Sequence, residues 1–399
     1  MSIRRIAFWA LLAFIFTIPW ETAITVGNVG TLTRVIGLGL AGIWTVSIAF
    51  EGGVRKLQLF HLASLAFIVY SATSILWTAS DEMSMLRLQT YVQLAVMTCI
   101  LWDLLTTSDD LHAAMQVFIL GAWLAVGSSI NNFLSGTWIS TYEVGRYSGA
   151  GQNAVELALI LALSLPMAWH LAMTRETGFG ANFLRIVNFA FIPAALFATL
   201  LTASRTALFV NVASIVYILW TLRLKGEAIH RLLLAGVLVG ALFYELSFIP
   251  KETLIRLSTV GNVIQGSDLG VRGWLWQETF SLFIQHPFFG IGAGALHAPD
   301  QLGSAAHNTY LSVLAELGIF GFFLFSIMLC NVMFKAVKQR SPFSGLWITV
   351  LVIWLFGVLS LTWEFTKTTW YILNMVIISS SIYGRSDDVD DAEGNELPT

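Results

Sequence analysis

Long apolar stretches, separated by short polar segments, occupy most of the chain. A membrane-spanning helix needs about 20 mostly apolar residues, so this pattern predicts an all-α integral membrane protein with about twelve such helices. The first stretch follows Arg4 and Arg5 as a signal peptide would, but no soluble domain comes after it, so we expect a retained helix. The predicted stretches are 7–25, 33–50, 58–78, 88–106, 111–135, 154–173, 186–203, 207–222, 232–248, 309–334, 344–363 and 368–383.

The composition narrows the class of protein further. Only 11% of the residues are charged, 56% are apolar, and the mean hydropathy is +0.75. The charged share is about half that of soluble domains, which excludes a soluble enzyme of this size. A nucleic-acid-binding protein is excluded because no strongly basic domain is present. Cys99 and Cys330 lie in apolar stretches and predict neither a disulfide framework nor a thiolate metal site.

The formal net charge of −3 comes from the end of the chain. Without the acidic residues there, the chain has 21 basic and 18 acidic groups and a net charge of +3. Since residues 384–399 are also poor in apolar side chains, we expect a disordered, acidic cytoplasmic tail. Its acidic residues are Asp387, Asp388, Asp390, Asp391, Glu393 and Glu396.

The basic residues of the short loops predict the orientation, because Lys and Arg concentrate in cytoplasmic loops. With the N-terminus inside, thirteen of the 21 basic residues fall in inner loops and eight in outer ones. We therefore expect both termini in the cytoplasm and an even number of helices. Four outer arginines lie in or beside segments that do not resemble simple connections, namely Arg146, Arg205, Arg256 and Arg272.

Two outer segments, 136–153 and 249–308, are long enough to carry a function. The predicted organisation is transmembrane helices over 1–248, one large periplasmic loop with short helices over 249–308, and transmembrane helices over 309–383, before the tail.

A helix is predicted over 272–286, inside the large loop, because apolar residues recur there at helical spacing and Pro287 ends the run. The residues of this face are Trp276, Phe280, Phe283 and Ile284. Such an aromatic face suits the membrane interface or a contact with the helix bundle. A plain lid helix suits the pattern equally.

The large loop and the helix after it hold a distinctive series of residues. Arg272 is followed by two tryptophans, then by H-P-x-x-G-x-G-x-G at 286–294 and H-N-x-x-L-x-x-x-x-E-x-G-x-x-G at 307–321. An R-x-x-G-x-x-x-N pattern at 146–153 and the pair Ser204-Arg205 precede them. This series resembles the signature of the O-antigen ligase and O-antigen polymerase superfamily, whose members are bacterial envelope glycosyltransferases.

The resemblance implies a GT-C-like multi-pass enzyme of the bacterial inner membrane with its active site on the periplasmic side. It implies a donor glycan on undecaprenyl pyrophosphate and, for a ligase, a lipid A-core acceptor. The protein would contact membrane lipid, from which the donor enters the site. The departing pyrophosphate needs a metal ion or fixed cations. Since the sequence shows no D-x-D pair before the acidic tail and no His, Asp or Glu set with metal-ligand spacing outside the membrane, we expect metal-independent, inverting transfer without a cofactor.

Arginine suits this task because its guanidinium stays charged and binds phosphate oxygens in pairs. Arg146 and Arg205 are the first candidates for binding the pyrophosphate, Arg272 follows, and Arg256 is weaker because it lies outside the motif. For each of them, a position at the lipid headgroups is the alternative.

His307 is the candidate catalytic base, because the acceptor hydroxyl must lose a proton and imidazole titrates near neutrality. The resemblance also implies an essential histidine at this His-Asn position. A purely structural hydrogen bond or helix cap is the alternative for His307. We expect Asn308 to orient the loop or cap the helix that follows.

Two further features of the motif are supporting candidates. Glu316 lies inside a predicted membrane helix, where a carboxylate is costly and therefore a functional candidate. It either pairs with an arginine or makes a polar helix contact. The glycines at 290, 292 and 294 predict a tight turn with positive φ angles, because a dinucleotide-binding loop would need a strand before it and a helix after it.

Four functions fit a chain of this kind. A polymerase is less favoured than a ligase because no R-x10-G repeat follows the outer arginines. A protein O-oligosaccharyltransferase often carries an additional soluble portion at its C-terminus, and the tail here is short. A transporter would build its site near the bilayer midplane, whereas these arginines and His307 are predicted at the outer rim. An O-antigen ligase is therefore the favoured function.

Overall fold

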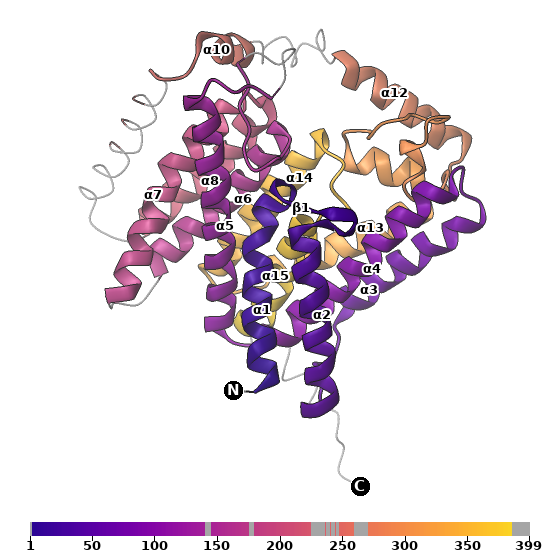
Figure 1. Ribbon diagram of the computed structural model, residues 1–399, viewed down its shortest axis with the longest axis horizontal. Coiled ribbons are helices and arrows are strands. Elements are labelled where there is room, and N and C mark those ends of the chain that lie inside the picture. Colours follow the sequence, from indigo (N-terminus) through magenta and orange to yellow (C-terminus); the bar gives the residue numbers. More distant parts are fainter. Residues whose placement is uncertain are drawn as a thin grey trace.

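The computed structural model of the chain is almost entirely helical (Figure 1). It describes residues 2–139, 145–174, 179–224, 236, 240, 244, 247–258 and 270–384. The long helices are α1 (Ile3–Thr17), α2 (Leu32–Glu51), α3 (Leu59–Thr73), α4 (Asp81–Leu104), α5 (Ser108–Leu134), α6 (Ala154–Thr174), α7 (Phe179–Leu201), α8 (Arg205–Leu224), α13 (Thr309–Val337), α14 (Phe343–Gly357) and α15 (Lys367–Tyr383).

Shorter elements lie at the helix ends. The helix α10 (Lys251–Ser258) and the longer α12 (Gly270–Gln285) both lie at the same end of the bundle, on opposite sides of the view in Figure 1. A two-stranded antiparallel hairpin of β1 (Thr25–Val26) and β2 (Gly30–Thr31) precedes α2. The 3-10 turns are η1 (Ile18–Ala23), η2 (Gly27–Val29), η3 (Ser74–Leu76), η4 (Ala295–His297) and η5 (Val358–Ser360).

The predicted stretches coincide with α1 to α8 and α13 to α15, which confirms an all-α membrane protein. Stretch 232–248 lies outside the described residues apart from a few positions. Within the described part of the chain, nine helical segments are long and apolar enough to cross a membrane. The helices α4 and α15 are not among them. The predicted tail lies outside the described residues except for Gly384.

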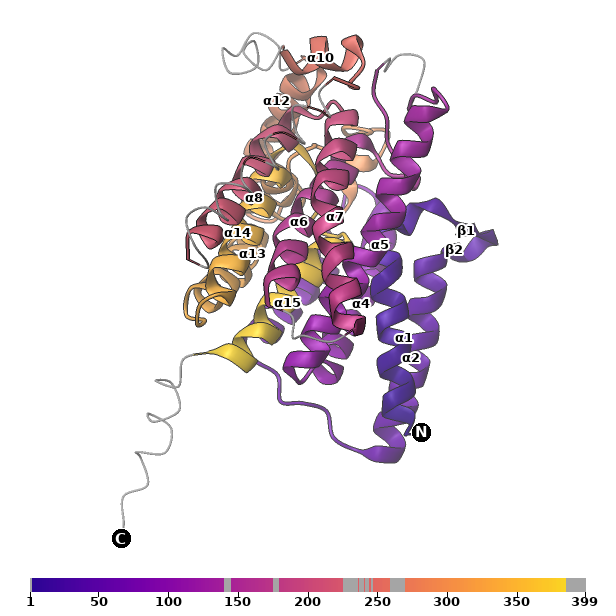
Figure 2. The same cartoon turned by 90° about the vertical axis from the view of Figure 1, so that its left-hand side faces the viewer.

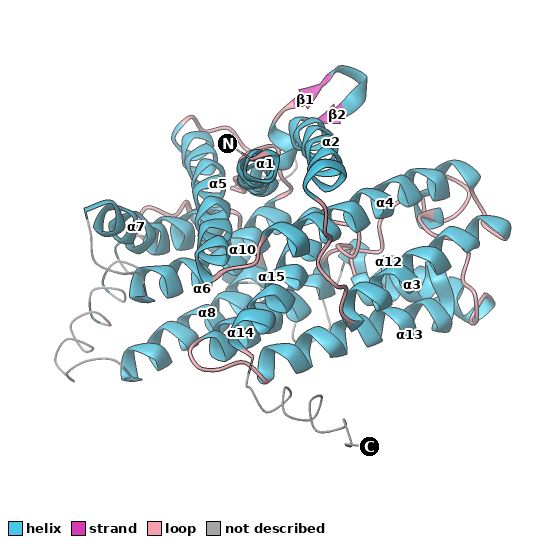
Figure 3. Ribbon diagram, turned by 90° about the horizontal axis from the view of Figure 1, so that it is seen from below, coloured by secondary structure: helices cyan, strands magenta, loops and turns pink. Residues whose placement is uncertain are grey.

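Polar residues of these two helices meet inside the bundle. Twelve of the 17 residues of α15 are buried, and Figure 3 shows this helix between α1 and α2 on one side and α13 and α14 on the other. Asn374 of α15 donates from Nδ2 to Thr98 Oγ1 of α4 at 3.0 Å. Polar groups in membrane helices are tolerated when they face protein partners rather than lipid.

The helix α2 is much less buried in the protein. Only 17% of its most apolar 18-residue stretch is buried, compared with 89% of the corresponding stretch in α6. In a soluble protein such an apolar surface would need a partner, but lipid solvates it at no cost. The helix α6 is thus the core of the bundle and α2 lies at its lipid-facing edge.

The first and last described residues lie at the same end of the bundle, opposite α10 and α12 (Figure 2). Arg4 pairs with Asp103 at 2.9 Å, and Arg55, beside it, donates to Ser381 Oγ near the end of α15 at 2.8 Å. An even number of membrane crossings requires this placement of the two ends.

Candidate functional site

The glycine loop, residues 290–294, forms a tight turn that packs on a break in α13. Its three glycines have φ angles of 71°, 104° and 79°, which confirms the predicted positive dihedrals. Gly318 interrupts α13 with φ 64° and ψ −168°, and this frees carbonyl groups that a continuous helix would use. The amides of Ile291 and Gly292 donate to the carbonyls of Ala315 and Glu316 at 3.0 and 2.9 Å.

We expect Gly292→Ala to lower the free energy of unfolding by about 3 kcal/mol, through overpacking and left-handed strain. A Cβ atom at Gly292 would lie 2.1 Å from Thr78 Oγ1. Thermal unfolding in detergent measures the loss. Gly303→Ala is the matched control, because Gly303 has φ +62° but its nearest neighbouring atom would be 3.9 Å away. Equal stability of the two variants would contradict the close packing of the loop.

Glu316 joins the glycine loop to a buried ion cluster. One oxygen, Oε2, accepts the Gly294 amide at 2.8 Å and lies 3.6 Å from Nη1 of Arg87. The same Arg87 nitrogen donates to Glu364 Oε1 at 2.6 Å. Glu316 therefore has an arginine partner as well as a polar contact, but the partner is Arg87 rather than one of the candidate arginines.

The cluster holds two carboxylates against one guanidinium. Arg87, Glu316 and Glu364 are 6%, 2% and 1% exposed, and the Arg87 guanidinium also lies 3.8 Å from the Phe365 ring centre. Glu364 lies in the segment between η5 and α15, and burial raises its pKa to about 7 although Arg87 opposes the rise. Protonation of Glu364 would reduce the excess of negative charge in this cluster.

Two histidines lie beside this cluster, on the same side as α12. His297 is close enough to Arg87 and Glu316 for their charges to act on it, and burial together with Arg87 lowers its pKa. The pKa of His307 is lowered by burial, by Arg272 and by His297. The charge of Arg272 thus acts on His307, and His297, which was not a candidate, lies near the same imidazole.

The backbone at His307 is left-handed, with φ 49°. A non-glycine residue in this region costs free energy, and such residues concentrate at functional sites. Asn308 follows as the N-cap of α13, and its Oδ1 accepts the amides of Tyr310 and Leu311 at 3.0 and 3.2 Å. This confirms the predicted cap and fixes the position of the residue before it.

Arg146 and Arg205 form a second group at the same end of the bundle. Arg146 is only 7% exposed, and its Nε donates to the Thr202 carbonyl at 3.0 Å, between α7 and α8. The amide of Tyr147 donates to the Leu201 carbonyl at 2.9 Å. Arg205, the first residue of α8, is half-buried. Burial in protein, rather than exposure at lipid headgroups, therefore characterises Arg146.

The segment 145–153 packs between α5 and α10. Gly149 packs so closely on α5 that a Cβ atom there would lie 2.5 Å from the Ser129 amide nitrogen. Thr253 of α10 donates its hydroxyl to the Gly145 carbonyl. The weaker candidate Arg256 belongs to the same helix α10, but the structure does not describe its side chain.

Trp363 connects the two groups. Its amide donates to Thr309 Oγ1 at 2.9 Å, two residues after His307. Its side chain lies within hydrogen-bonding reach of the Glu156 carboxylate at the start of α6. The Asn153 amide, at the end of the segment that carries Arg146, donates to the same carboxylate at 3.4 Å.

The helix predicted over 272–286 is present as α12 and ends before Pro287. Leu275 and Thr279 are buried and Phe283 packs inward, whereas Phe280 and Ile284 are 48% and 61% exposed. The helix packs against α13. Trp276 is half-buried on this helix.

Arg87 and Glu364 are the residues at this site that sequence reasoning missed. Both residues adjoin apolar stretches of the sequence. An ionisable side chain at such a position is costly in a membrane, so it indicates a candidate functional residue. Among the residues that the structure describes, no group of three or more His, Cys, Asp or Glu side chains is arranged to hold a metal ion.

The fold and this site define a multi-pass membrane protein with a polar, arginine-containing site at one end of its helix bundle. A family model described as O-antigen ligase matches residues 189–326, from within α7 to within α13. The match confirms the resemblance to the O-antigen ligase superfamily, whose members are glycosyltransferase-like enzymes acting on lipid-linked glycans. A comparison with curated proteins gave no match.

Proposed function

We propose that this protein is an O-antigen ligase, which transfers a glycan from undecaprenyl pyrophosphate to lipid A-core on the periplasmic face of the bacterial inner membrane. The observation that carries the proposal is the left-handed backbone of the half-buried His307, on whose imidazole the charge of Arg272 acts. The matched O-antigen ligase family supports the chemical class.

The proposed reaction is a single displacement. A hydroxyl of the acceptor attacks the anomeric carbon of the donor, and His307 takes the proton of that hydroxyl as a general base. The bond from the anomeric carbon to the pyrophosphate oxygen breaks with inversion, and the pyrophosphate leaves with the electron pair. A lowered His307 pKa supports this role, because the imidazole is then neutral and able to accept a proton at pH 7.

Arg146, Arg205 and Arg272 bind the pyrophosphate in this proposal. Arg205 is the first residue of α8, so its guanidinium lies at the positive end of the helix dipole. An anion bound there would be stabilised by both the guanidinium and the helix N-terminus. Asn308, Glu316 and Trp276 are supporting residues that hold the loop and α12.

The orientation belongs to the proposal as well. Arg4 and Arg55 lie at the end of the bundle that carries both chain ends, and the positive-inside rule assigns that end to the cytoplasm. The opposite end, with α10, α12 and His307, then faces the periplasm.

Purified protein incubated with undecaprenyl-pyrophosphate-linked glycan and lipid A-core tests the function. We expect transfer to the core in the presence of chelator, because fixed guanidinium groups take the place of a metal ion, and loss of transfer in Arg205→Ala. Glycan lengthened on the lipid carrier would instead identify a polymerase. Transfer that stops with chelator and returns with a divalent cation would contradict the metal-independent mechanism.

The acidic limb of the pH–rate profile should move to higher pH in Arg272→Met. The base must be unprotonated, so kcat falls as the pH drops through the pKa of His307. Arg272 lowers that pKa, and its removal raises it. Lys251→Met, a change at an exposed residue of α10, should leave the limb in place. An unmoved limb in Arg272→Met would show that this arginine does not act on the base.

A further inference from the structure

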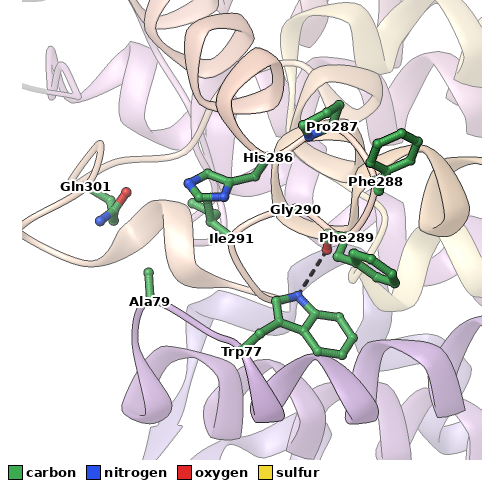
Figure 4. Close-up of a pocket in the computed structure, with 9 residues that line it drawn as sticks. All are labelled: Trp77, Ala79, His286, Pro287, Phe288, Phe289, Gly290, Ile291 and Gln301. Atoms are coloured by element: carbon green, nitrogen blue, oxygen red, sulfur yellow. Dashed lines mark hydrogen bonds between the residues drawn. The ribbon is translucent and has the colours of Figure 1, made fainter.

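A cavity of about 620 Å³ opens beside the glycine loop (Figure 4). It lies between the η3–α4 connection and the segment that follows α12. The volume falls in the range of pockets that hold small organic ligands. It is lined by Trp77, Ala79, His286, Pro287, Phe288, Phe289, Gly290, Ile291 and Gln301.

The aromatic wall of this cavity is held in place. Trp77 Nε1 donates to the Phe289 carbonyl at 3.2 Å (Figure 4), and the two rings meet edge to face with centroids 5.5 Å apart. Tyr70 supports Trp77 from the other side at 6.2 Å, and the Tyr70 hydroxyl donates to the Leu317 carbonyl at 3.0 Å. A ring fixed in this way loses little conformational entropy when a ligand packs on it.

The polar side chains at the cavity are an imidazole and an amide. His286 and Gln301 both border the cavity, and Figure 4 shows them on the loop side, away from Trp77. None of the nine lining residues is Lys, Arg, Asp or Glu. A phosphate group would therefore meet no guanidinium or ammonium here, and an isoprenoid chain would leave the polar groups without partners.

An aromatic platform opposite amide and imidazole groups is complementary to a pyranose ring. The axial C–H face of such a ring packs on an aromatic surface, while its hydroxyl groups bond to side chains such as those of histidine and glutamine. The ligand class with these two faces and no charge requirement is a neutral sugar.

The position of the cavity relates it to the proposed reaction. The Ala79 amide donates to the Ile291 carbonyl at 2.8 Å, so the cavity wall is continuous with the glycine loop that receives Glu316. Gln301 lies six residues before His307 in the same connection. We propose that this cavity is a sugar-binding subsite, which holds a pyranose ring of one glycan substrate beside the transfer site; this inference rests on the proposed function.

Binding is tested apart from catalysis by saturation-transfer difference NMR with two saccharides freed of lipid: the core oligosaccharide and the released O-antigen glycan. We expect ring C–H signals from one of them with the wild-type protein, and their loss in Trp77→Ala and Gln301→Ala. Trp274→Ala is the control, because Trp274 of α12 is 54% exposed and does not line the cavity. Signals from either saccharide that persist unchanged in both cavity variants would overturn the subsite, as would their absence with the wild type.

Kinetics then identify which substrate occupies the subsite. In Trp77→Ala and Gln301→Ala the KM for that substrate should rise about tenfold with kcat little changed, the size expected for one lost stacking contact. A rise for lipid A-core assigns the acceptor, and a rise for the lipid-linked donor assigns the donor glycan. A fall in kcat alone would overturn the subsite. Failure of the proposed function is separate, because it appears as absent transfer with the NMR signals intact.

Discussion

Replacing His307 with asparagine is expected to lower kcat for glycan transfer by about 10²- to 10⁴-fold, the contribution of a positioned general base. Asparagine is the informative substitution because it tolerates the left-handed backbone that His307 adopts, with φ 49°. The variant therefore removes the proton acceptor without adding backbone strain. Single-turnover transfer to lipid A-core, measured with saturating donor, gives the rate directly.

Two controls make the result specific. Thermal unfolding should be nearly unchanged in His307→Asn, because Asn308 caps α13 independently of the imidazole. Added imidazole should restore part of the rate in His307→Gly, since a small base can occupy the space of the lost side chain. Full activity in His307→Asn would show that the histidine is not the catalytic base. Its role would then be structural, as a hydrogen-bonding or helix-capping residue.

Arg87→Met should destabilise the protein by about 3–5 kcal/mol, the usual effect of removing one partner of a buried ion pair. Glu316 and Glu364 would then be two buried acids without a compensating cation. The Phe365 ring would lose its contact with the guanidinium as well. The midpoint of thermal unfolding in detergent measures the effect.

The charge explanation predicts a rescue. Combining Arg87→Met with Glu316→Gln and Glu364→Gln removes all three ionisable groups and should recover much of the stability, because no buried charge is left. Arg5→Met provides the control for loss of a cation, since Arg5 is exposed at the other end of the bundle. An Arg87→Met variant as stable as Arg5→Met would show that the cluster does not depend on this arginine.

Hydropathy alone predicted most of the helices, because lipid-facing side chains must be apolar whatever the tertiary structure is. It placed the start of α4 later than the structure does, at residue 88 rather than at Asp81. The first turns of that helix carry Asp81, Glu82 and Arg87, which are costly in lipid, and Arg87 is satisfied by residues far away in sequence. A window of neighbouring residues cannot detect such a partner.

The site was predictable where local rules determine it. The Asn308 cap and the turn at residues 290–294 follow from the chemistry of helix N-caps and of glycine. Recognition of the family motif selected His307 and Arg272, whose charge acts on that histidine. The break at Gly318 and the contacts of Arg87 with both acids arise from packing between distant segments, and no local pattern specifies them.

The hydrogen bonds from the glycine loop to α13 affect how the protein unfolds locally. A loop at the end of a helix bundle is normally the first part to open, because few contacts hold it. Here the amides of Ile291 and Gly292 donate to carbonyls of α13, and the Ile319 amide of α13 donates to the Pro287 carbonyl at 2.8 Å. We therefore expect the loop and the first half of α13 to open together, as one cooperative unit.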